Sequence, residues 1–489
     1  MKFKALTTCF AGGGTGHYTQ QGRLSPDEKN TENQVINLHP ELSWEVFEGF
    51  GGAVTDAATY VYSLMNEEQK KEVLSTYFSK EGLGYQLLRV PVDSCDFSLE
   101  TYDSLVEKEP VKVAVQRAGK YIFPMLKDIF AVCEEQPEIM VSPWSPPEYM
   151  KTNGQRQRGG HLKREYYPDW AEYICQYILA LQAEGFPVKR MSIQNEANAV
   201  QKWDSCLYSA EEEREFLKTA LYPALKKHGL DKIEIYIWDH NKERLYERAV
   251  ETIDSETEKM ITGMAFHWYS GDHFEEMELV RKRFPGLKLI LSESCLEYCK
   301  FRSDDVTEGV FSLLHELIGD LNHGMSMFHD WNLCLDEEGG PNYVGNYCHA
   351  PCLFHKGKKR LLPQPTLDCF YHISHYLRPG SVRIAHSVYT DKIESVAYKN
   401  TDGSIILVLL NRTEKQLPVN LRLHGQSHKI RRACTDFFHQ LSVFVCSVNA
   451  VKTVNTSQNI LHLFCCKNSP IHSVIFHNRN TATCSLSGH

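Results

Sequence analysis

Short apolar runs alternate with longer amphipathic stretches from Phe47 to Trp331. This alternation is typical of repeated strand–helix units around a parallel sheet. Eight of the apolar runs have the length and composition of strands: VFEGFGGAV, GYQLLRVPV, EIMVSPW, VKRMSIQN, KIEIYIW, ITGMAFHWY, LKLILSE and GMSMFHDW. Because eight parallel strands close into a barrel, the pattern predicts an α/β fold with a (β/α)8 TIM barrel over residues 46–378.

Two of the amphipathic stretches are predicted to be helices on the outside of this barrel. Residues 66–79 and 209–229 carry apolar side chains at steps of three and four, which places those side chains on one helix face. The second stretch begins with Ser209 and three glutamates and ends in Lys-Lys-His-Gly, as helix ends prefer. We expect a helix over each stretch.

The periodicity changes beyond the barrel, and a second, all-β module is expected there. Residues 392–423 have the pattern of a strand meander, with a hairpin turn at 400–403. The residues before Trp44 are expected to add strands to the same module. The predicted organisation is an N-terminal segment, the barrel and a β-sandwich domain, over residues 1–45, 46–378 and 379–430.

The last 59 residues differ in composition from the rest of the chain. Between Arg431 and His489 the only acidic residue is Asp436, although the chain carries 62 acids, and the segment holds five cysteines. This break predicts an atypical tail over residues 431–489. Such a tail is either a frame-shifted or poorly ordered end, or an unusual extension.

Charge and composition narrow the classes of partner. The formal net charge of −9 argues against nucleic acid or an anionic membrane surface, because both attract clustered Lys and Arg. No window approaches the roughly 18 apolar residues of a membrane helix, and the opening stretch does not resemble a secretory signal. The 16 cysteines show no zinc spacing, so we expect reduced thiols, a cytoplasmic protein and a small polar substrate.

The chemistry of a strand–helix barrel is carried by residues at the C-terminal ends of its strands. Carboxylates and aromatic rings dominate those positions here. Aromatic faces cover the C–H side of a sugar ring, and acids and amides bind its hydroxyls, so the set suits a sugar site. The predicted rim consists of Asp56, Arg89, Asp96, Phe97, Trp144, Asn195, Glu196, Trp238, Asp239, His240, His267, Trp268, Tyr269, Glu293, Asp330, Trp331 and Asn332.

Two glutamates in this rim each follow an apolar strand directly. Glu196 comes after RMSIQN and Glu293 after LKLILS, three predicted strands further on. In a closed ring the two carboxyl groups therefore face one another across the mouth. Retaining glycoside hydrolysis needs two carboxyl groups roughly 5 to 5.5 Å apart, so the pair predicts this reaction.

Two other classes of function compete with this interpretation. His240, His267, His329 and Asp330 lie at neighbouring strand ends, as in a metallohydrolase, but His-X-His and His-Glu-X-X-His spacings are absent. We therefore expect no metal and no cofactor. A sugar-binding barrel without activity is expected to have lost one of its two glutamates, and this chain keeps both.

Seven motifs in order resemble glycoside hydrolase family 30, the glucosylceramidase family. The resemblance runs from about Phe47 to Arg378 and reaches into the β module as far as Leu423. It implies a retaining β-glycosidase built from a (β/α)8 barrel and a β-sandwich formed by both chain ends. The motifs are FEGFGGAVTDAA, EGLGYQLLRVPVDSCDFS, SPWSPPEYMKTNG, SIQNEAN, GMAFHWYSGDHF, LILSESC and DWNLCLDEEGGPNYVGNYCHAP.

The resemblance also implies a role for individual residues. Glu196 corresponds to the acid/base and Glu293 to the nucleophile, with Arg89 and His267 as supporting residues. Arg89 and Tyr269 match positions that surround the nucleophile. Residues that match the family's substrate-binding positions are Asp96, Trp144, Asn195, Tyr269, Trp331 and Asn346.

The resemblance implies protonation states and a substrate class as well. Glu293 must be ionised to attack, which Arg89 favours, and Glu196 must begin protonated. The sugar-binding set favours a terminal β-glucoside, such as that of glucosylceramide, over β-xylosides, β-fucosides or β-1,6-glucan, and leaves the aglycone side around Trp203 undetermined. The chain departs from the family at Ala197, where a proline is usual, and after Leu423, where the family's closing strands are not visible.

Overall fold

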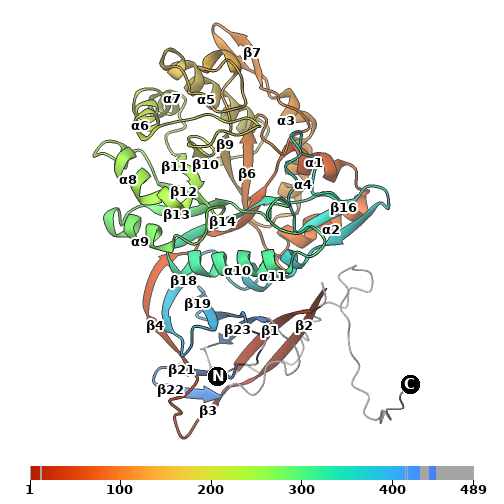
Figure 1. The fold of residues 1–489 in the computed structure, drawn as a ribbon, viewed down its shortest axis with the longest axis vertical. Helices are drawn as coiled ribbons and strands as arrows, with labels where there is room; N and C mark the ends of the chain where they lie inside the picture. The colour runs from red at the N-terminus through yellow and green to blue at the C-terminus, as the bar shows by residue number, and fades with distance from the viewer. Residues whose placement is uncertain (1, 12–13, 414, 416, 430–439, 448–489) are drawn as a thin grey trace.

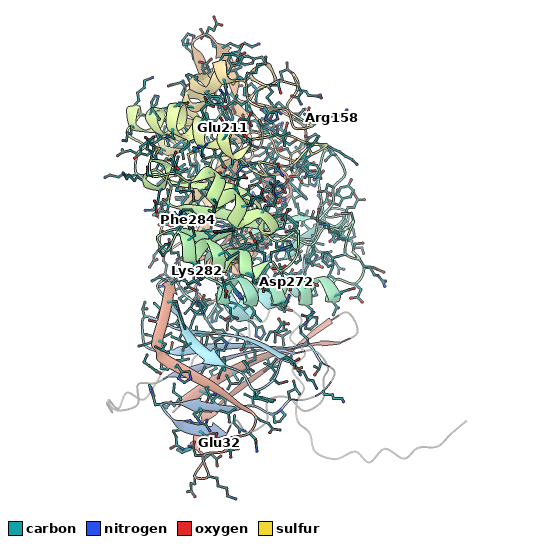
Figure 2. All side chains as sticks on the ribbon, turned by 60° about the vertical axis from the view of Figure 1, so that its left-hand side comes forward. Glu32, Arg158, Glu211, Asp272, Lys282 and Phe284 are labelled. Carbon is teal, nitrogen blue, oxygen red and sulfur yellow. The ribbon has the colours of Figure 1, made fainter. Side chains whose placement is uncertain are left out.

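The protein forms a barrel domain with a β-sheet domain beneath it (Figure 1). The computed structural model describes residues 2–11, 14–413, 415, 417–429 and 440–447. In this part of the chain no helix has both the length and the apolar character that crossing a membrane requires. Charged side chains cover the outside of both domains, as exposed Glu32, Arg158, Glu211 and Lys282 illustrate (Figure 2).

All eight predicted strands form one closed parallel barrel, which confirms the predicted fold class. Their order around the ring is β10-β11-β12-β13-β14-β5-β6-β9. Buried apolar side chains of the barrel strands form a separate core cluster, which includes Met140, Ile290 and Met327. The strand bounds are β5 (Gly49–Ala53), β6 (Leu87–Val92), β9 (Glu138–Pro143), β10 (Val188–Ser192), β11 (Glu234–Asn241), β12 (Gly263–His267), β13 (Lys288–Glu293) and β14 (Met325–Asn332).

Amphipathic helices surround the barrel. In α2 the apolar residues Val73, Leu74, Tyr77 and Phe78 are buried, and Asn66 begins the helix with a capping box. The helices are α1 (Asp56–Ser63), α2 (Glu67–Phe78), α3 (Gln116–Lys120), α4 (Ile122–Val132), α5 (Tyr167–Ala183), α6 (Ala210–Phe216), α7 (Tyr222–Lys227), α8 (Leu245–Thr252), α9 (Phe274–Arg283), α10 (Thr307–Asn322) and α11 (Pro365–Ser374).

Shorter elements line the loops between the barrel strands and helices. Three strand pairings, β7 with β8 and β16 with both β15 and β17, form two small sheets separate from the barrel. The short strands are β7 (Leu105–Lys108), β8 (Val111–Val113), β15 (Leu335–Asp336), β16 (Cys352–His355) and β17 (Arg360–Pro363). The single-turn helices are η1 (Glu148–Met150), η2 (Arg164–Tyr166), η4 (Lys242–Arg244) and η5 (Thr257–Lys259).

The helix predicted over residues 209–229 contains a break. A π-helical turn, η3 (Leu217–Leu221), separates α6 from α7, and the Tyr222 N–H donates to the Leu217 carbonyl. Pro223 lies directly after this bond. Because proline has no N–H and its ring clashes with the preceding turn, a regular α-helix cannot pass through it, and the wider turn accommodates it.

The second domain is a ten-stranded sheet that contains both ends of the described chain, as predicted. Its strand order is β2-β1-β23-β20-β19-β18-β4-β21-β22-β3. One face of the sheet buries a separate core that includes Ile36, Ile384 and Leu407. The strands are β1 (Lys2–Ala11), β2 (Gly14–Arg23), β3 (Ser25–Pro26), β4 (Val35–Val46), β18 (Val382–Ser387), β19 (Ile393–Lys399), β20 (Ile405–Asn411), β21 (Asn420–Leu423), β22 (Gln426–Lys429) and β23 (Gln440–Ser447).

One strand of this sheet lies in the segment that was expected to be an atypical tail. β23 pairs antiparallel with β1 on one side and with β20 on the other, so the sheet domain continues beyond residue 430. The tail was inferred from its lack of acids, but a strand forms from apolar and β-branched residues, and QLSVFVCS supplies them. The other residues from 431 onward lie outside the described part of the chain.

The two domains are joined by backbone and side-chain contacts. The N–H of Phe47, just after β4, donates to the carbonyl of Ser381 at 2.8 Å. Glu45 forms ion pairs with Arg281 of the barrel at 2.9 Å and with Arg383 of the sheet. Helices α10 and α11 contact strands of the sheet and lie between the two domains (Figure 1).

Candidate active site

The C-terminal ends of the barrel strands surround a pocket of about 210 Å³. Both predicted reacting glutamates and all six predicted substrate-binding residues line its wall. The lining residues are Asp96, Trp144, Asn195, Glu196, Gln201, Trp203, His240, Asn241, Tyr269, Glu293, Cys295, Glu297, Lys300, Trp331, Asn346 and Cys348. Burial of so many polar groups is costly and requires partners within the site.

The backbone at Glu196 is fixed by the strands on either side. The Asn195 N–H donates to the Pro143 carbonyl of β9 at 2.8 Å, and the Glu196 N–H donates to the Asp239 carbonyl of β11 at 2.8 Å. Glu196 itself is left-handed, with φ of 49°, an uncommon conformation for a residue with a side chain. The next residue, Ala197, is fully buried, so the turn holds without the proline usual in the family.

Arg89 donates hydrogen bonds to four residues at and behind the pocket wall. Its Nη1 donates to Glu293 Oε2 at 2.6 Å, and its Nη2 donates to Asn195 Oδ1 at 2.8 Å and to Asp239 Oδ2 at 2.9 Å. The Nε donates to Ser142 Oγ at 3.1 Å. The guanidinium is fully buried, and two carboxylates balance its charge, as a buried cation requires.

Glu293 receives a second hydrogen bond, from the Tyr269 hydroxyl to Oε1 at 3.0 Å. Both of its oxygens are therefore oriented by donors. Burial raises the pKa of Glu293, against the opposing charges of His267 and Arg89. The two donors stabilise the ionised carboxylate, which is the form that the nucleophile of a retaining glycosidase needs.

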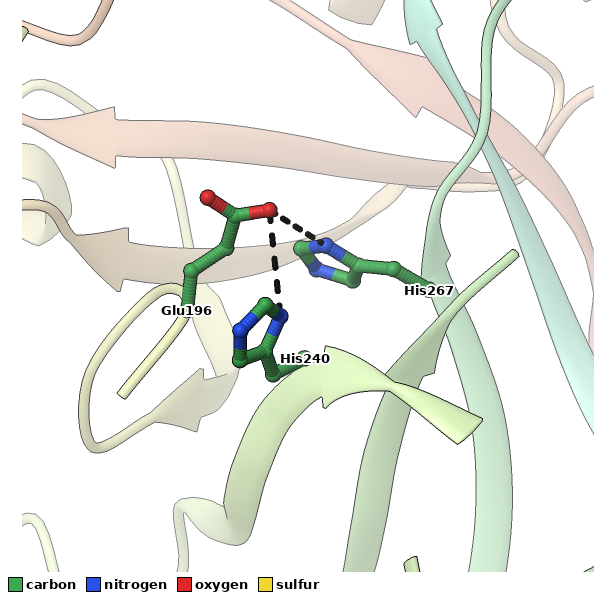
Figure 3. A group of neighbouring side chains, drawn as sticks. All are labelled: Glu196, His240 and His267. Atoms are coloured by element: carbon green, nitrogen blue, oxygen red, sulfur yellow. Dashed lines mark ion pairs between the residues drawn. The ribbon is translucent and has the colours of Figure 1, made fainter. Parts of the chain in front are cut away.

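Glu196 has a different environment, formed by two histidines (Figure 3). Its Oε1 lies 3.6 Å from His267 Nδ1 and 3.8 Å from His240 Nδ1, while Gln201 Nε2 donates to Oε2 at 3.1 Å. Burial acts to raise the pKa of Glu196, but the contacts with His267 and His240 lower it to about 2. The free site therefore keeps this carboxyl ionised.

The pKa of His267 is shifted in the opposite direction. Burial acts to lower the pKa of His267, but the surrounding carboxylates, first that of Glu293, raise it to about 9. His267 Nε2 lies 3.1 Å from Asp239 Oδ1. The expectation that Glu196 begins protonated stays a prediction, and the two imidazoles that flank this carboxyl are a feature that the sequence does not reveal.

Asp239 is the anchor behind these groups, a role that the sequence did not assign. Besides Arg89 and His267 it accepts from the Ser192 hydroxyl and the Ser292 hydroxyl, each at 2.5 Å. Burial acts to raise the pKa of Asp239, but the charge of Arg89 and its other partners lower it strongly. A buried carboxylate with this many donors stays ionised and fixes the orientation of its neighbours.

Two indoles and an aspartate form another wall. The rings of Trp144 and Trp331 stack with centroids 5.3 Å apart and planes 15° apart. Asp96 Oδ2 accepts from Asn342 Nδ2 at 3.3 Å, and the Asn342 side chain also accepts from the Asn346 N–H at 3.0 Å. Burial raises the pKa of Asp96. Sequence reasoning missed Asn342. The only signal for it was its place in the same motif as Asn346.

Several residues of the predicted rim have structural roles outside the pocket. Asp56 pairs with Arg117 at 2.9 Å, and Trp238 Nε1 donates to the Asn241 carbonyl at 2.9 Å. Trp268 Nε1 donates to the Cys295 carbonyl at 3.0 Å. Sequence reasoning in turn missed six pocket residues. Asn241 was missed because β11 runs further than the predicted strand, and the others lie on loops where no strand ends: Gln201, Cys295, Glu297, Lys300 and Cys348.

The metal-ligand candidates of the sequence are only partly brought together. Among the described residues, Glu196, His240 and His267 form a cluster in which one ligand atom of each lies within 4.8 Å of the others. His329 is not part of it, since its Nδ1 bonds to the Leu291 carbonyl at 3.2 Å. Asp330 is buried elsewhere and also lies outside the cluster.

The sequence profiles of one family match both domains. The profile of the glycosyl hydrolase family 30 TIM-barrel domain matches residues 47–378. The chain belongs to glycosyl hydrolase family 30. The profile of the family 30 beta sandwich domain matches residues 380–456, a range that includes β23. The family and the fold predicted from the motifs are thereby confirmed.

Known family 30 proteins resemble the chain over most of its length. It is 30% identical to the lysosomal acid glucosylceramidase of Mus musculus over 79% of each chain. It is 33% identical to SrfJ from Salmonella typhimurium, with a TM-score of 0.84 over 91% of this chain and 99% of that one. An endo-beta1,6-glucanase structure is 25% identical, with a TM-score of 0.80 over 92% and 99%. The family 30 chain is therefore a retaining glycosidase that acts on carbohydrate.

Proposed function

We propose that this family 30 glycosidase releases terminal β-glucosyl residues from glucosides of the glucosylceramide type, with Glu293 as nucleophile and Glu196 as acid/base. The observation that supports this proposal is a single pocket lined by both glutamates, by two stacked indole rings and by Asp96. Its volume of about 210 Å³ is below the 300–1,000 Å³ of sites for drug-sized ligands. Such a pocket suits one sugar ring.

Two kinds of side chain contact that sugar ring: stacked indoles on one hand, and amide and carboxyl groups on the other. The faces of Trp144 and Trp331 cover apolar C–H surface, and Asp96 and Asn346 bind hydroxyl groups. Asn195 Oδ1 is held by Arg89 at 2.8 Å, which leaves its amide N–H groups to donate to the sugar. A contact of this kind with the 2-hydroxyl strengthens as the oxocarbenium character develops.

The first chemical step joins the sugar to the protein. A Glu293 oxygen attacks the anomeric carbon, forming a C–O ester bond while the bond to the leaving oxygen breaks. Arg89 and Tyr269 hold the attacking carboxylate in place through their hydrogen bonds of 2.6 and 3.0 Å. The leaving oxygen takes a proton from Glu196.

The proton for this step is held by Glu196 and His267 together. His267 Nδ1 carries it in the free protein and lies 3.6 Å from Glu196 Oε1, so a small approach passes it to the carboxyl. Once Glu293 is esterified, Glu196 is ionised and takes a proton from the incoming water. Water then attacks the anomeric carbon, the ester bond breaks, and glucose leaves with its β configuration.

Mass spectrometry with a 2-deoxy-2-fluoro β-glucosyl donor tests the proposal. The fluorine slows both steps and a good leaving group such as fluoride restores the first, so the glycosyl-enzyme should accumulate on the peptide that contains Glu293. Glu293→Gln should give no adduct, whereas Glu297→Gln, which changes another glutamate of the same pocket, should still give it. An adduct formed only by the corresponding xylosyl donor would overturn the choice of glucose, and an adduct on another residue would overturn the nucleophile.

The similarity to an endo-beta1,6-glucanase supports a second candidate, internal cleavage of β-1,6-glucan. The two activities differ in their first products. A terminal glucosidase releases only glucose from glucosylceramide or 4-nitrophenyl β-glucoside, while an endo-acting enzyme releases oligosaccharides from β-1,6-glucan and does little to the small glucoside. Product analysis by chromatography on these substrates decides between them.

A further inference from the structure

We propose that Glu196, His240 and His267 form a binding site for a Zn²⁺ ion, and that zinc bound there blocks glycoside hydrolysis. The three side chains come from three successive barrel strands: β10 ends before Glu196, His240 lies in β11 and His267 ends β12. Figure 3 shows the two imidazoles converging on one oxygen of the carboxylate. The sequence lacked a metal motif because these ligands are separated along the chain.

The spacing of the ligand atoms fits zinc closely. Bonds of about 2.1 Å in tetrahedral geometry place neighbouring ligand atoms about 3.4 Å apart. Glu196 Oε1 lies 3.6 Å from His267 Nδ1 and 3.8 Å from His240 Nδ1. The two histidine nitrogens lie within 4.8 Å of each other, so side-chain shifts of up to about 1.4 Å, without a change of rotamer, complete the geometry.

Both histidine nitrogens that face the carboxylate are without a hydrogen-bond partner. His240 Nδ1 and His267 Nδ1 are buried atoms that neither donate nor accept within hydrogen-bond distance. The His267 side chain is fully buried, and burying an unpartnered polar atom costs free energy. A cation between these nitrogens and the carboxylate satisfies all three groups at once.

The surroundings of His267 supply an outer shell that metal sites commonly have. Its Nε2 lies 3.1 Å from Asp239 Oδ1, and Ser192 and Ser292 hold the same carboxylate. A carboxylate behind the ligating imidazole fixes the ring so that the other nitrogen points to the metal. The pocket wall further includes the carboxylates of Asp96, Glu293 and Glu297, which favour a cation electrostatically.

The consequence for the reaction follows from the shared ligand. A Glu196 oxygen that coordinates zinc cannot carry the proton for the leaving oxygen, and the ion occupies the space beside that oxygen. The three protein ligands leave a fourth position open toward the pocket, which water fills. Zinc therefore acts as a reversible inhibitor that competes with the glycoside, and a chelator restores activity.

Isothermal titration of the full, chelator-treated protein with Zn²⁺ alone tests the site without any sugar. The wild type should bind one ion in the pocket, and His240→Asn should weaken that affinity at least about tenfold, the loss that even an outer-shell change typically causes. Glu196→Gln, which keeps the shape and removes the ligand charge, should weaken it similarly. The matched control is His161→Asn, because His161 lies on the surface paired with Glu212 and should leave the affinity unchanged.

Visible absorption of the Co²⁺-substituted protein gives a second readout, since tetrahedral cobalt with nitrogen and oxygen ligands has strong bands that H240N should remove. Equal zinc affinity in the wild type, H240N and E196Q would overturn the proposal, as would zinc binding without loss of 4-nitrophenyl β-glucoside hydrolysis. If the glucoside is not a substrate while zinc binding depends on His240, the glucosidase proposal fails and the metal site stands.

Discussion

Glu196 and Glu293 have identical side chains and opposite surroundings. Glu293 accepts hydrogen bonds from a guanidinium and a phenol, whereas Glu196 lies against two imidazoles. The two proposed roles therefore depend on the position and hydrogen-bond partners of each carboxyl, because the pKa directions of the ligand-free site, lowered for Glu196 and raised for Glu293, do not by themselves assign them.

The effect of replacing Glu196, the proposed acid/base, should depend on the leaving group. Glu196→Gln should lower kcat/KM for glucosides with poor leaving groups by about 10²- to 10⁴-fold, the usual worth of general acid catalysis. With a 2,4-dinitrophenyl leaving group, which needs no proton, kcat/KM should fall far less and the deglycosylation step should limit kcat. Steady-state kinetics on both substrates check this, and equal losses on the two would contradict the role.

His267 should determine the upper pH limit of activity. Its pKa, raised to about 9, means that the pair holds its proton below that pH and loses it as the pH rises through it. His267→Gln removes the cation that lowers the pKa of Glu196, so Glu196 holds its own proton. The basic limb of kcat/KM should then move to lower pH than in the wild type.

A pH profile distinguishes this role from simple packing. A merely structural effect of His267→Gln would lower activity at every pH and leave the basic limb in place. That result would contradict a shared proton. His315→Gln is a suitable control, since the pKa of His315 is also raised to about 9, first through its contact with Glu394, away from the pocket.

At the scale of elements, the close contact between β5 and β6 depends on glycine. A Cβ at Gly51 would lie 1.9 Å from the carbonyl oxygen of Leu87, and backbone cannot move aside cheaply. Gly51→Ala should therefore lower the free energy of unfolding by about 1–3 kcal/mol or more. Gly286→Ala is the control, because nothing lies within 4 Å of its added Cβ; urea unfolding of both variants gives the comparison, and equal stabilities would refute the argument.

The strands and helices were largely predictable because their signals are local. The alternation of apolar and polar residues gave all eight barrel strands, and the Ser209 cap gave the start of α6. The π-helical turn before Pro223 was missed. The position of this turn depends on how the proline ring fits into the helix. The spacing of apolar residues carries no information about that fit.

At the scale of the whole molecule, the sheet domain depends on both ends of the described chain. β23 fills the gap between β1 and β20, so its loss would divide the sheet and expose two strand edges. A chain that ends after Lys429 should melt roughly 5 °C or more below one that ends after Ser447. Calorimetry on the two truncations checks this, and equal Tm values would show that β23 contributes nothing to stability.

The sequence by itself determined the barrel, its strand order along the chain, the family, and the two glutamates and six substrate-binding candidates that line the pocket, because each of these is written in local periodicity or in contiguous motifs. Tertiary structure decided the rest. Asp239 contacts both Arg89 and His267, the pKa of His267 is raised, and His240 lies beside Glu196, where we propose that it binds zinc. These properties depend on distances of 3–4 Å between groups from different strands, and charge states respond to such distances through space, whatever their separation along the chain.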